Sequence, residues 1–442
     1  MAEDEFAPAP LVLDFNPLHT LGFLVTDWIE QHCRVPSGVY FDQPLELNGW
    51  QLYCNANHYR VKANAKPDPT RLVAPFYYRR SLWVGPQKSG KSPLAAADAL
   101  AEGVGPTIFA GWARGGEVYR CSDHGCGCGW EREYEPGEAM GAPRTKSLIA
   151  LLAFAEDQTR NVYEPLQTMI AGGPLSDFVH VREGFIRLPN GGKIVPVTSA
   201  SRSKLGQPFT AAIADESGLY TEQSGVMTTW HTIRRAVAGM QGRTIELTNP
   251  WDPMENSSAQ QTYQARVRDI FRFYEHPPLE WDYSKKADRS KIHRFVYASS
   301  PWVDPKAIDA EADELMERDP TQAERFFGNR LVQGKGSYLS EKVWEGATRD
   351  EQPEDGAEIT LGFDGSRSGD WTAIRAETAN GLRFTPTYGP DRRDTVWDPQ
   401  AWPDGRIPRG EVEAAVAEIM DRYDVQRFYC DPRHWETQID HW

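Results

Sequence analysis

The sequence predicts an α/β protein with a mainly parallel β-sheet, followed by a second, smaller α/β domain. Three observations lead to this prediction. The apolar run SLWV (81–84) passes through a glycine-rich loop into an alanine-rich helical segment that ends at Gly103, and this order starts a βαβ unit. Two further apolar runs, 209–215 and 244–250, have the length of buried parallel strands. A new β-rich segment begins near residue 358.

Length and composition are those of a multi-domain globular protein. The 442 residues exceed what one hydrophobic core usually serves, and 40% of them are hydrophobic. No apolar run approaches the roughly 20 residues that a membrane span needs. The acidic start MAEDEFAPAP differs from the basic start of a secretory signal. Six clustered cysteines are too few for a disulfide scaffold, so we expect a reducing, cytoplasmic setting.

The charge balance is acidic, at 48 − 63 = −15. It argues against a simple nucleic-acid-binding module, which normally carries a basic stripe. It does not exclude a protein that contacts DNA through a few local lysines and arginines.

The chain divides into four predicted segments. These are a helical lead-in (1–70), a core (71–254) with a cysteine-rich insertion (115–145), a helical lid or linker (255–355), and the second domain (356–442). TIFAGW (107–112) is expected to be the strand that completes the βαβ unit. Residues 255–345 are rich in charge and are expected to be helical, especially over DPKAIDAEADELMERDPTQAERFFGNRL.

The strongest local signal is GPQKSGKS (85–92), which matches G-x-x-x-x-G-K-[ST] between a predicted strand and a predicted helix. Gly85 and Gly90 allow the backbone to wrap around phosphates, Lys91 places a cation on the β- and γ-phosphates, and Ser92 offers a hydroxyl to magnesium. A glycine turn with a surface lysine is the other reading, and the strand–loop–helix context disfavours it. We predict nucleoside-triphosphate binding by the whole loop: Gly85, Pro86, Gln87, Lys88, Ser89, Gly90, Lys91 and Ser92.

An acidic pair follows the next buried strand in AAIADE (211–216). Asp215 is predicted to reach the magnesium ion through water, and Glu216 to orient and deprotonate the attacking water. The alternative is a strand followed by a solvated acidic turn. The Asp-Glu pair is typical of ATPases that do mechanical work. Asn249, in LTNP (247–250), is expected near the γ-phosphate, although the same residues also read as a simple turn.

The order and spacing of these motifs resemble the large terminase subunit of tailed bacteriophages, particularly those of actinobacteria. The similarity runs from about Trp50 to the end of the chain. It rests on Trp50-Gln51, GPQKSGKS, AEDQTRNVY (155–163), SRSKLGQPF (201–209), AAIADE, LTNP, LGFDGSRSGDWTA and FYCDP. The resemblance implies a P-loop NTPase of the additional-strand, conserved-glutamate type, followed by a partial ribonuclease-H-like nuclease domain.

The resemblance also implies an activity. It indicates an ATP-driven motor that moves double-stranded viral DNA into a procapsid, with a metal-dependent endonuclease that cuts the concatemer. Gln51 resembles an adenine-reading glutamine, or is an ordinary polar helix residue. Arg202 or Lys204 lies where the family places an arginine finger, which stabilises γ-phosphoryl charge on a neighbouring subunit's ATP. A basic surface loop is the alternative for either residue.

The nuclease chemistry of the family requires two Mg²⁺ or Mn²⁺ ions held by carboxylates. Asp364 closes the strand ITLGFD and Asp431 closes RFYCD, so we expect the pair to converge on metal, with Asp370 a weaker third candidate. Each aspartate alone reads as a turn starter. We count four strand candidates where the fold needs at least five, and the chain stops at Trp442. An inactive or incomplete nuclease is therefore expected, completed by another polypeptide or truncated in a fragment.

Partners and location also follow from the resemblance. It implies double-stranded DNA, the procapsid portal ring, the small terminase subunit and other copies in a ring, with a monomer in solution and no membrane. The location is the host cytoplasm and, transiently, the portal vertex, but not the mature virion. A helicase-type translocase or repair ATPase without a capsid partner is the alternative, which the FDGS…CDP pair disfavours. In a third reading the C-terminal part only docks on the portal ring.

The cysteine-rich insertion contains CSDHGCGCGW (121–130). Cys121, His124, Cys126 and Cys128 are a candidate Zn²⁺ set, because thiolates and imidazole are zinc ligands. Paired C-x₂-C knuckles are absent, so a glycine-rich loop with free thiols remains the alternative.

Overall fold

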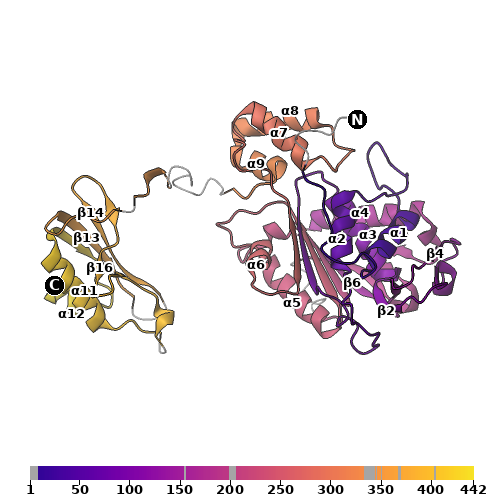
Figure 1. Ribbon diagram of the computed structural model, residues 1–442, viewed down its shortest axis with the longest axis horizontal. Helices are drawn as coiled ribbons and strands as arrows, with labels where there is room; N and C mark the ends of the chain where they lie inside the picture. Colours follow the sequence, from indigo (N-terminus) through magenta and orange to yellow (C-terminus); the bar gives the residue numbers. More distant parts are fainter. Residues whose placement is uncertain are drawn as a thin grey trace. The chain divides into compact units, whose positions relative to one another are not determined.

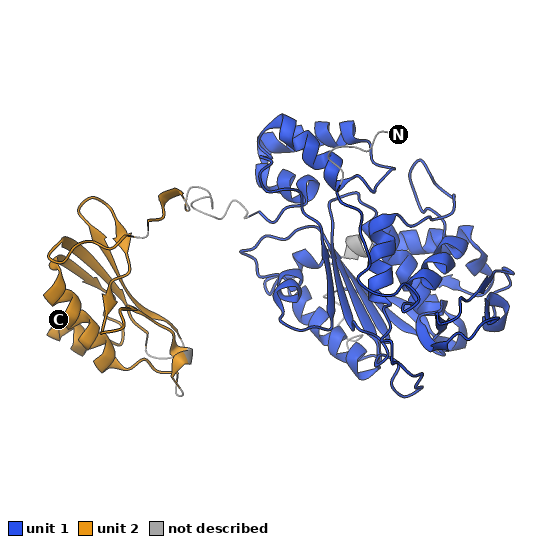
Figure 2. Cartoon of the chain, in the orientation of Figure 1, with its two compact units in different colours: residues 1–338 blue, residues 339–442 orange. Residues whose placement is uncertain are grey.

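The computed structural model describes residues 8–153, 156–198, 206–332, 344, 346–349, 351–366, 370–402 and 405–442, with the side chains of 156–161 and 400 outside this description. The chain forms two compact units, residues 1–338 and 339–442, which are coloured separately in Figure 2. Each unit has its own hydrophobic core. Within the described residues no helix is long and apolar enough to span a bilayer.

An eight-stranded, mainly parallel sheet forms the centre of the first unit (Figure 1). In spatial order it contains β12 (Ile270–Tyr274), β1 (Arg80–Val84), β11 (Arg243–Thr248), β10 (Ala211–Asp215), β6 (Leu148–Leu152), β9 (Lys193–Val197), β8 (Phe185–Arg187) and β7 (His180–Arg182). The first six run parallel, whereas β8 and β7 add an antiparallel edge. The predicted α/β class with a mainly parallel sheet is confirmed. One strand, β11, lies between β1 and β10, as the additional-strand class requires.

The central strands are buried along their whole length because helices cover both faces of the sheet. Every residue of β1, β10 and β11 is buried. Alternate side chains point to opposite faces, so Ile213 packs in the core that includes α3 (Lys91–Val104), α4 (Glu156–Gly172) and α1 (Gly22–His32). Ala212 and Ala214 pack with Trp230 of α5 (Val226–Gly239) on the other face. A further helix, α2 (Gly49–His58), joins the first of these cores.

Two strand predictions need correction. TIFAGW forms a strand, β2 (Ile108–Trp112), but it pairs antiparallel with β5 (Ala139–Ala142) in a separate sheet instead of completing the βαβ unit. The parallel neighbours of β1 are β11 and β12. The segment predicted as helical from residue 255 therefore includes an edge strand of the central sheet. This strand, β12, is only five residues long and follows a charged stretch, so the periodicity of apolar residues did not reveal it.

The remainder of that segment is helical. It contains α6 (Ser258–Gln264), α7 (Lys286–Val296), α8 (Pro305–Arg318) and α9 (Pro320–Gly328). Asp304 and Asp319 cap α8 and α9 through hydrogen bonds to backbone N–H groups. Helices α7–α9 share two small cores, one around Tyr297 and Phe327 and the other around Tyr283.

The cysteine-rich insertion is a short hairpin. Strands β3 (Val118–Arg120) and β4 (Glu131–Glu133) pair antiparallel, and the 3₁₀ turn η1 (Cys121–His124) follows β3 directly. Gly125 and Gly129 adopt positive φ angles of 87° and 74°, which let the chain double back between the strands.

The second unit contains a five-stranded sheet. β13 (Glu358–Asp364) pairs antiparallel with β14 (Thr372–Thr378) and parallel with β19 (Asp424–Cys430). β15 (Arg383–Phe384) and β18 (Val396–Trp397) both pair with β14. Helix α11 (Arg409–Arg422) packs on this sheet, and α12 (Glu436–His441) follows β19. The predicted count of four strands is too low: the described residues of this unit contain seven, five of them in this sheet. RFTPTYG divides, since β16 (Thr387–Tyr388) pairs with β17 (Arg393–Asp394). β17 and β18 were missed because each is two residues long.

Candidate nucleotide site

The phosphate loop connects the buried strand β1 to the first turn of α3. Gly90 caps this helix with φ +90°, a left-handed conformation that glycine adopts without strain. A Cβ atom at this position would lie 2.8 Å from the Trp302 ring and 3.1 Å from Nε2 of Gln51. Backbone geometry and crowding therefore both require glycine here. The loop residues lie at the amino end of α3, where helix N–H groups favour anions.

Lys91 is buried, and its ammonium contacts three oxygens. Nζ donates hydrogen bonds to the Gly85 carbonyl (3.1 Å), the Pro86 carbonyl (2.7 Å) and Oδ1 of Asn249 (2.7 Å). Burial lowers the pKa of Lys91, while the Glu216 and Asp215 carboxylates oppose that change. The cation is thus held at the carboxyl edge of the sheet between the loop and the acidic pair.

Ser92 and Asp215 meet beside the loop. The Ser92 hydroxyl donates to Oδ2 of Asp215 at 3.0 Å. Burial, followed by the negative charge of Glu216, raises the pKa of Asp215 to about 7. Its other oxygen, Oδ1, is buried without a hydrogen-bond partner among the described residues. A buried carboxylate oxygen next to a hydroxyl is the kind of oxygen donor that Mg²⁺ prefers, so the residues present fit this ion.

Glu216 and Asn249 form the next contact. Glu216 has φ +57°, a strained value for a residue with a side chain. Its carboxylate accepts hydrogen bonds from Nδ2 of Asn249 (3.0 and 3.1 Å) and from the Asn249 backbone N–H (3.2 Å). Because Oδ1 of the same amide accepts from Lys91, Asn249 links the cation to the acidic pair. The sequence predicted Asn249 near this site but not this link.

The segment that contains α7–α9 also contacts the phosphate loop, through Tyr297 and Trp302 between α7 and α8 and through Phe326 of α9. Sequence reasoning missed these contacts. The Tyr297 hydroxyl donates to the Gln87 carbonyl at 2.8 Å, and Nε1 of Trp302 donates to the Lys88 carbonyl at 3.0 Å. The Gln87 N–H donates to the Phe326 carbonyl at 2.7 Å. The two side-chain partners are 210 and 214 residues from the loop residues that they bind, so no local pattern in the sequence signals these bonds.

Gln51 lies against the loop as well. Its Nε2 donates to the Gly90 carbonyl at 3.2 Å, and its Oε1 accepts from the Asn48 N–H at the start of α2. The structure therefore brings the predicted nucleotide-binding residues of α2, the loop, β10 and β11 together. The arginine-finger candidates Arg202 and Lys204 lie outside the described residues.

In the second unit, Asp364 and Asp431 follow paired positions of adjacent parallel strands. Phe363 is in register with Cys430, and the Asp431 N–H donates to the Phe363 carbonyl at 3.0 Å. Both aspartates are exposed. Oδ1 of Asp431 accepts from the Arg433 N–H, the contact of a turn starter. Asp370 is exposed next to Trp371.

The zinc prediction needs one correction. The described residues contain one cluster of at least three His, Cys, Asp or Glu ligand atoms, and its members are His32, Cys121, Cys126 and Cys128. His124 is not among them; its ring lies against Tyr119, with centroids 5.0 Å apart. His32 was missed because it is 89 residues from Cys121 in the sequence.

Comparison with known proteins gives relatives in both sequence and fold. No protein-family model matches the chain. The Gene 13 protein of Mycobacterium phage D29 is 26% identical over 97% of this chain and 75% of the relative. The Gene 13 protein of Mycobacterium phage L5 is 25% identical over 97% and 76%. The crystal structure of the HK97 bacteriophage large terminase matches with a TM-score of 0.52 and 19% identity, covering 95% of this chain and 81% of that one.

Proposed function

We propose that this chain, which has the fold of a phage large terminase, is an ATP-hydrolysing motor that moves double-stranded DNA into a procapsid. The observation that carries the proposal is the hydrogen-bonded series from Lys91 through Asn249 to Glu216, next to the Ser92–Asp215 pair. This series supports the proposal because a cation, a candidate metal-binding pair and a candidate base lie around one phosphate loop. These are the groups that phosphoryl transfer needs.

Each residue has a distinct proposed role. Lys91 leaves the carbonyls of Gly85 and Pro86 to contact the β- and γ-phosphates. Ser92 and Asp215 hold the magnesium ion, which neutralises charge on the phosphates when it is bound. Glu216 orients the attacking water and accepts its proton. Gln51 reads the adenine, and Arg202 or Lys204 of a neighbouring subunit contributes the arginine finger.

Energy coupling is proposed to pass through two contacts of the loop. The hydrogen bonds from Asn249 to Lys91 and Glu216 change when the γ-phosphate is cleaved. The segment that contains α7–α9 responds to that change because Tyr297 and Trp302 of this segment donate hydrogen bonds to the loop carbonyls. A local change in charge can thus shift the equilibrium between two conformations of a segment. In this proposal residues 255–355 act as the lid, residues 71–254 as the ATPase core, and residues 1–70 as the lead-in.

The hydrolysis proposal is tested by phosphate release from the wild type, Lys91→Ala and Glu216→Gln in the presence of Mg²⁺ and linear DNA. Both variants should lose at least about 100-fold in rate, because each removes a group that acts on the transition state. Exposed residues outside the proposed site serve as matched controls: Lys146→Ala and Glu222→Gln should keep the wild-type rate. Equal rates in all five proteins would overturn the assignment.

The packaging proposal needs a separate measurement, because a helicase-type translocase would also hydrolyse ATP on DNA. The chain is combined with procapsids, their portal ring and the small terminase subunit, and DNase-protected DNA is measured. Protection that requires ATP and is lost in Glu216→Gln supports packaging. Duplex unwinding without protection would favour the helicase-type alternative.

For the second unit we propose carboxylate-held divalent metal and a nuclease role, supported by the paired strand positions before Asp364 and Asp431. Mn²⁺ binding to the full chain is measured by electron paramagnetic resonance without nucleotide in the Asp215→Asn background, which removes the proposed metal ligand of the first site. Asp364→Asn and Asp431→Asn should each remove one class of bound Mn²⁺, whereas Asp394→Asn should not. Manganese-dependent cleavage of a plasmid would exclude a purely docking role for this unit. Loss of no Mn²⁺ in either variant would contradict the proposal.

A further inference from the structure

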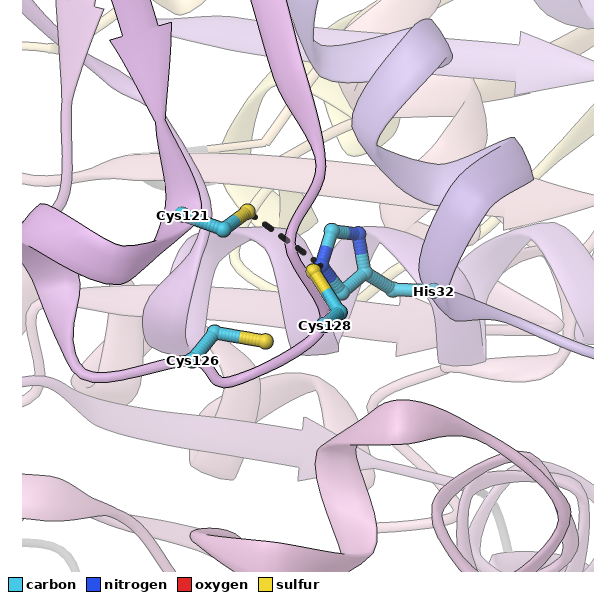
Figure 3. Close-up of side chains that lie close together, drawn as sticks. All are labelled: His32, Cys121, Cys126 and Cys128. Carbon is cyan, nitrogen blue, oxygen red and sulfur yellow. Dashed lines mark hydrogen bonds between the residues drawn. The ribbon is translucent and has the colours of Figure 1, made fainter.

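We propose that His32, Cys121, Cys126 and Cys128 form a tetrahedral structural zinc site that fastens the β3–β4 insertion to helix α1. The four ligand atoms all lie within 4.8 Å of one another. Figure 3 shows the three sulfur atoms and the imidazole ring of His32 directed toward one another. The site is separate from the nucleotide chemistry proposed above, so either proposal can fail without the other.

The distances fit a zinc ion. Nε2 of His32 lies 3.4 Å from Sγ of Cys121 and 3.3 Å from Sγ of Cys128. Zn–S bonds of about 2.3 Å and Zn–N bonds of about 2.0–2.1 Å at tetrahedral angles place sulfur and nitrogen roughly 3.5 Å apart. The observed separations are within a few tenths of an ångström of that value.

The imidazole of His32 presents the correct atom to a metal. Its Nδ1 lies 2.7 Å from the Trp28 carbonyl, and a carbonyl only accepts hydrogen bonds. Nδ1 therefore carries the proton, so the lone pair of the neutral ring is on Nε2, which faces the sulfurs. Metal-binding histidines usually donate their second N–H in this way, which fixes the tautomer and the ring orientation.

Three thiols without a metal do not explain this arrangement equally well. Sγ of Cys121 and Sγ of Cys128 both face Nε2, which has one lone pair and can accept one S–H. The backbone N–H of Trp130 also donates to Sγ of Cys128 at 3.4 Å, and an electron-rich sulfur is the better acceptor for such a bond. A central cation satisfies all of these groups at once. Three sulfurs and one imidazole nitrogen are a soft donor set that selects zinc over magnesium or calcium.

The surroundings are those of a closed structural site. His32, Cys121 and Cys126 are at most 4% exposed. Trp28 stacks on the His32 ring with centroids 4.4 Å apart, and Trp130 meets it edge-on at 5.9 Å. All four positions of a tetrahedral ion are filled by protein atoms, which leaves none for water or substrate. The metal therefore acts in folding and not in catalysis.

The proposed zinc connects segments that are distant in the sequence. Helix α1 contributes His32 from its last turn, and the hairpin contributes the cysteines from η1 and the glycine-rich turn after it. A second contact joins the same elements, because Nε of Arg132 on β4 donates to Asp27 of α1 at 2.6 Å. The hairpin has only three residues in each strand, so it needs such a fastening to stay ordered.

The test measures metal in the full-length protein purified in reducing buffer without added chelator. Wild type should contain about one zinc per chain by elemental analysis. After exchange with Co²⁺ it should show thiolate-to-cobalt charge-transfer absorption and tetrahedral d–d bands. His32→Ala should lower the zinc content and affinity by about tenfold or more. The matched control is His124→Ala, which removes the other histidine of the region and should retain full zinc.

Each alternative outcome is decisive. Wild-type protein that contains no zinc and takes up none on titration overturns the site. Retention of zinc by His32→Ala together with its loss in His124→Ala overturns the ligand assignment. If His32→Ala is insoluble, the Co²⁺ spectra of wild type and His124→Ala still decide, because absence of thiolate–cobalt bands in both contradicts the proposal. A Cys121–Cys126 disulfide in the reduced preparation would also overturn it.

Discussion

Within the part of the chain that the structure describes, Asn249 is the one side chain that hydrogen-bonds to both Lys91 and Glu216 of the proposed hydrolysis site. We expect Asn249→Ala to lower kcat for ATP hydrolysis by about 10–100-fold, because hydrogen bonds to charged groups contribute about 1.5–3 kcal/mol. KM should change less, since Lys91 remains. The measurement is steady-state phosphate release, with the exposed Asn64→Ala as control. A kcat within twofold of wild type would show that Asn249 is only a turn residue.

Asp98 gives a pH prediction at the same scale. It is a fully buried residue of α3, and burial raises its pKa well above 3.8; Glu102 adds to the rise, whereas Asn55 and Arg243 oppose it. The folded protein therefore binds this proton more tightly than the unfolded chain. Its contribution to stability is complete below about pH 4 and is lost as the pH rises toward the folded pKa.

Asp98→Asn removes that titration. The difference in unfolding free energy between variant and wild type should therefore shift in favour of the variant as the pH rises from about 4 to 8. Urea denaturation at several pH values measures this difference. The exposed Asp177→Asn is the control for an Asp-to-Asn substitution made without burial. A constant difference for Asp98→Asn would contradict the assigned burial effect.

Single residues were predictable where one segment contains the whole signal. Lys91 and Ser92 follow from the glycine loop between a strand and a helix, and Asp215 and Glu216 follow from the end of a buried strand. The structure brings these residues together. His32 was not predictable, because its partners Cys121 and Cys128 come from a distant segment. His124 was chosen because it lies among the cysteines in the sequence, but it is not part of the cluster.

At the scale of elements, a buried ion pair joins β1, β11 and α6. Arg80 contacts Glu246 at 3.0 Å with side-chain exposures of 7% and 1%, and Thr262 and Ser258 also donate to Glu246. Glu246→Ala leaves Arg80 buried without its partner, so we expect a loss of about 3–5 kcal/mol in unfolding free energy. Urea denaturation followed by tryptophan fluorescence measures the loss.

An exposed pair offers the comparison for that prediction. Arg318 and Glu314 are 2.9 Å apart, but their side chains are 67% and 65% exposed. Glu314→Ala should therefore change stability by less than about 1 kcal/mol. Similar losses for both variants would show that Glu246 does not hold the three elements together.

Elements were predictable where the apolar pattern was long, and their pairing was not. The strand–loop–helix order of β1 and α3 is visible locally, whereas the partner of β2 depends on residues 139–142 across the insertion. β12 and β18 were missed because five- and two-residue strands carry little periodic signal. Pairing of strands is a tertiary property, and no single window of sequence contains it.

At the scale of the whole molecule, two separate cores predict two unfolding transitions. The first unit has the large core around the central sheet, and the second has its own core around Ile359 and Val416. Differential scanning calorimetry should resolve two transitions. Mg·ADP at about 100 times its Kd should stabilise only the first unit, by about 2.7 kcal/mol. One transition that shifts as a whole with nucleotide would contradict this independence.

The bonds from Tyr297 and Trp302 to the loop have a consequence for the orientation of its peptide planes. A trans peptide is planar, and its C=O and N–H bonds point in opposite directions; none of the peptide bonds between described residues is cis. Fixing the carbonyls of Gln87 and Lys88 toward α7–α9 therefore turns the N–H groups of Lys88 and Ser89 to the opposite side. The helical segment thus sets the direction of the dipoles in the phosphate loop. A rotation of that segment would turn these dipoles, and an anion bound there would lose two donors without any change in the loop's own sequence.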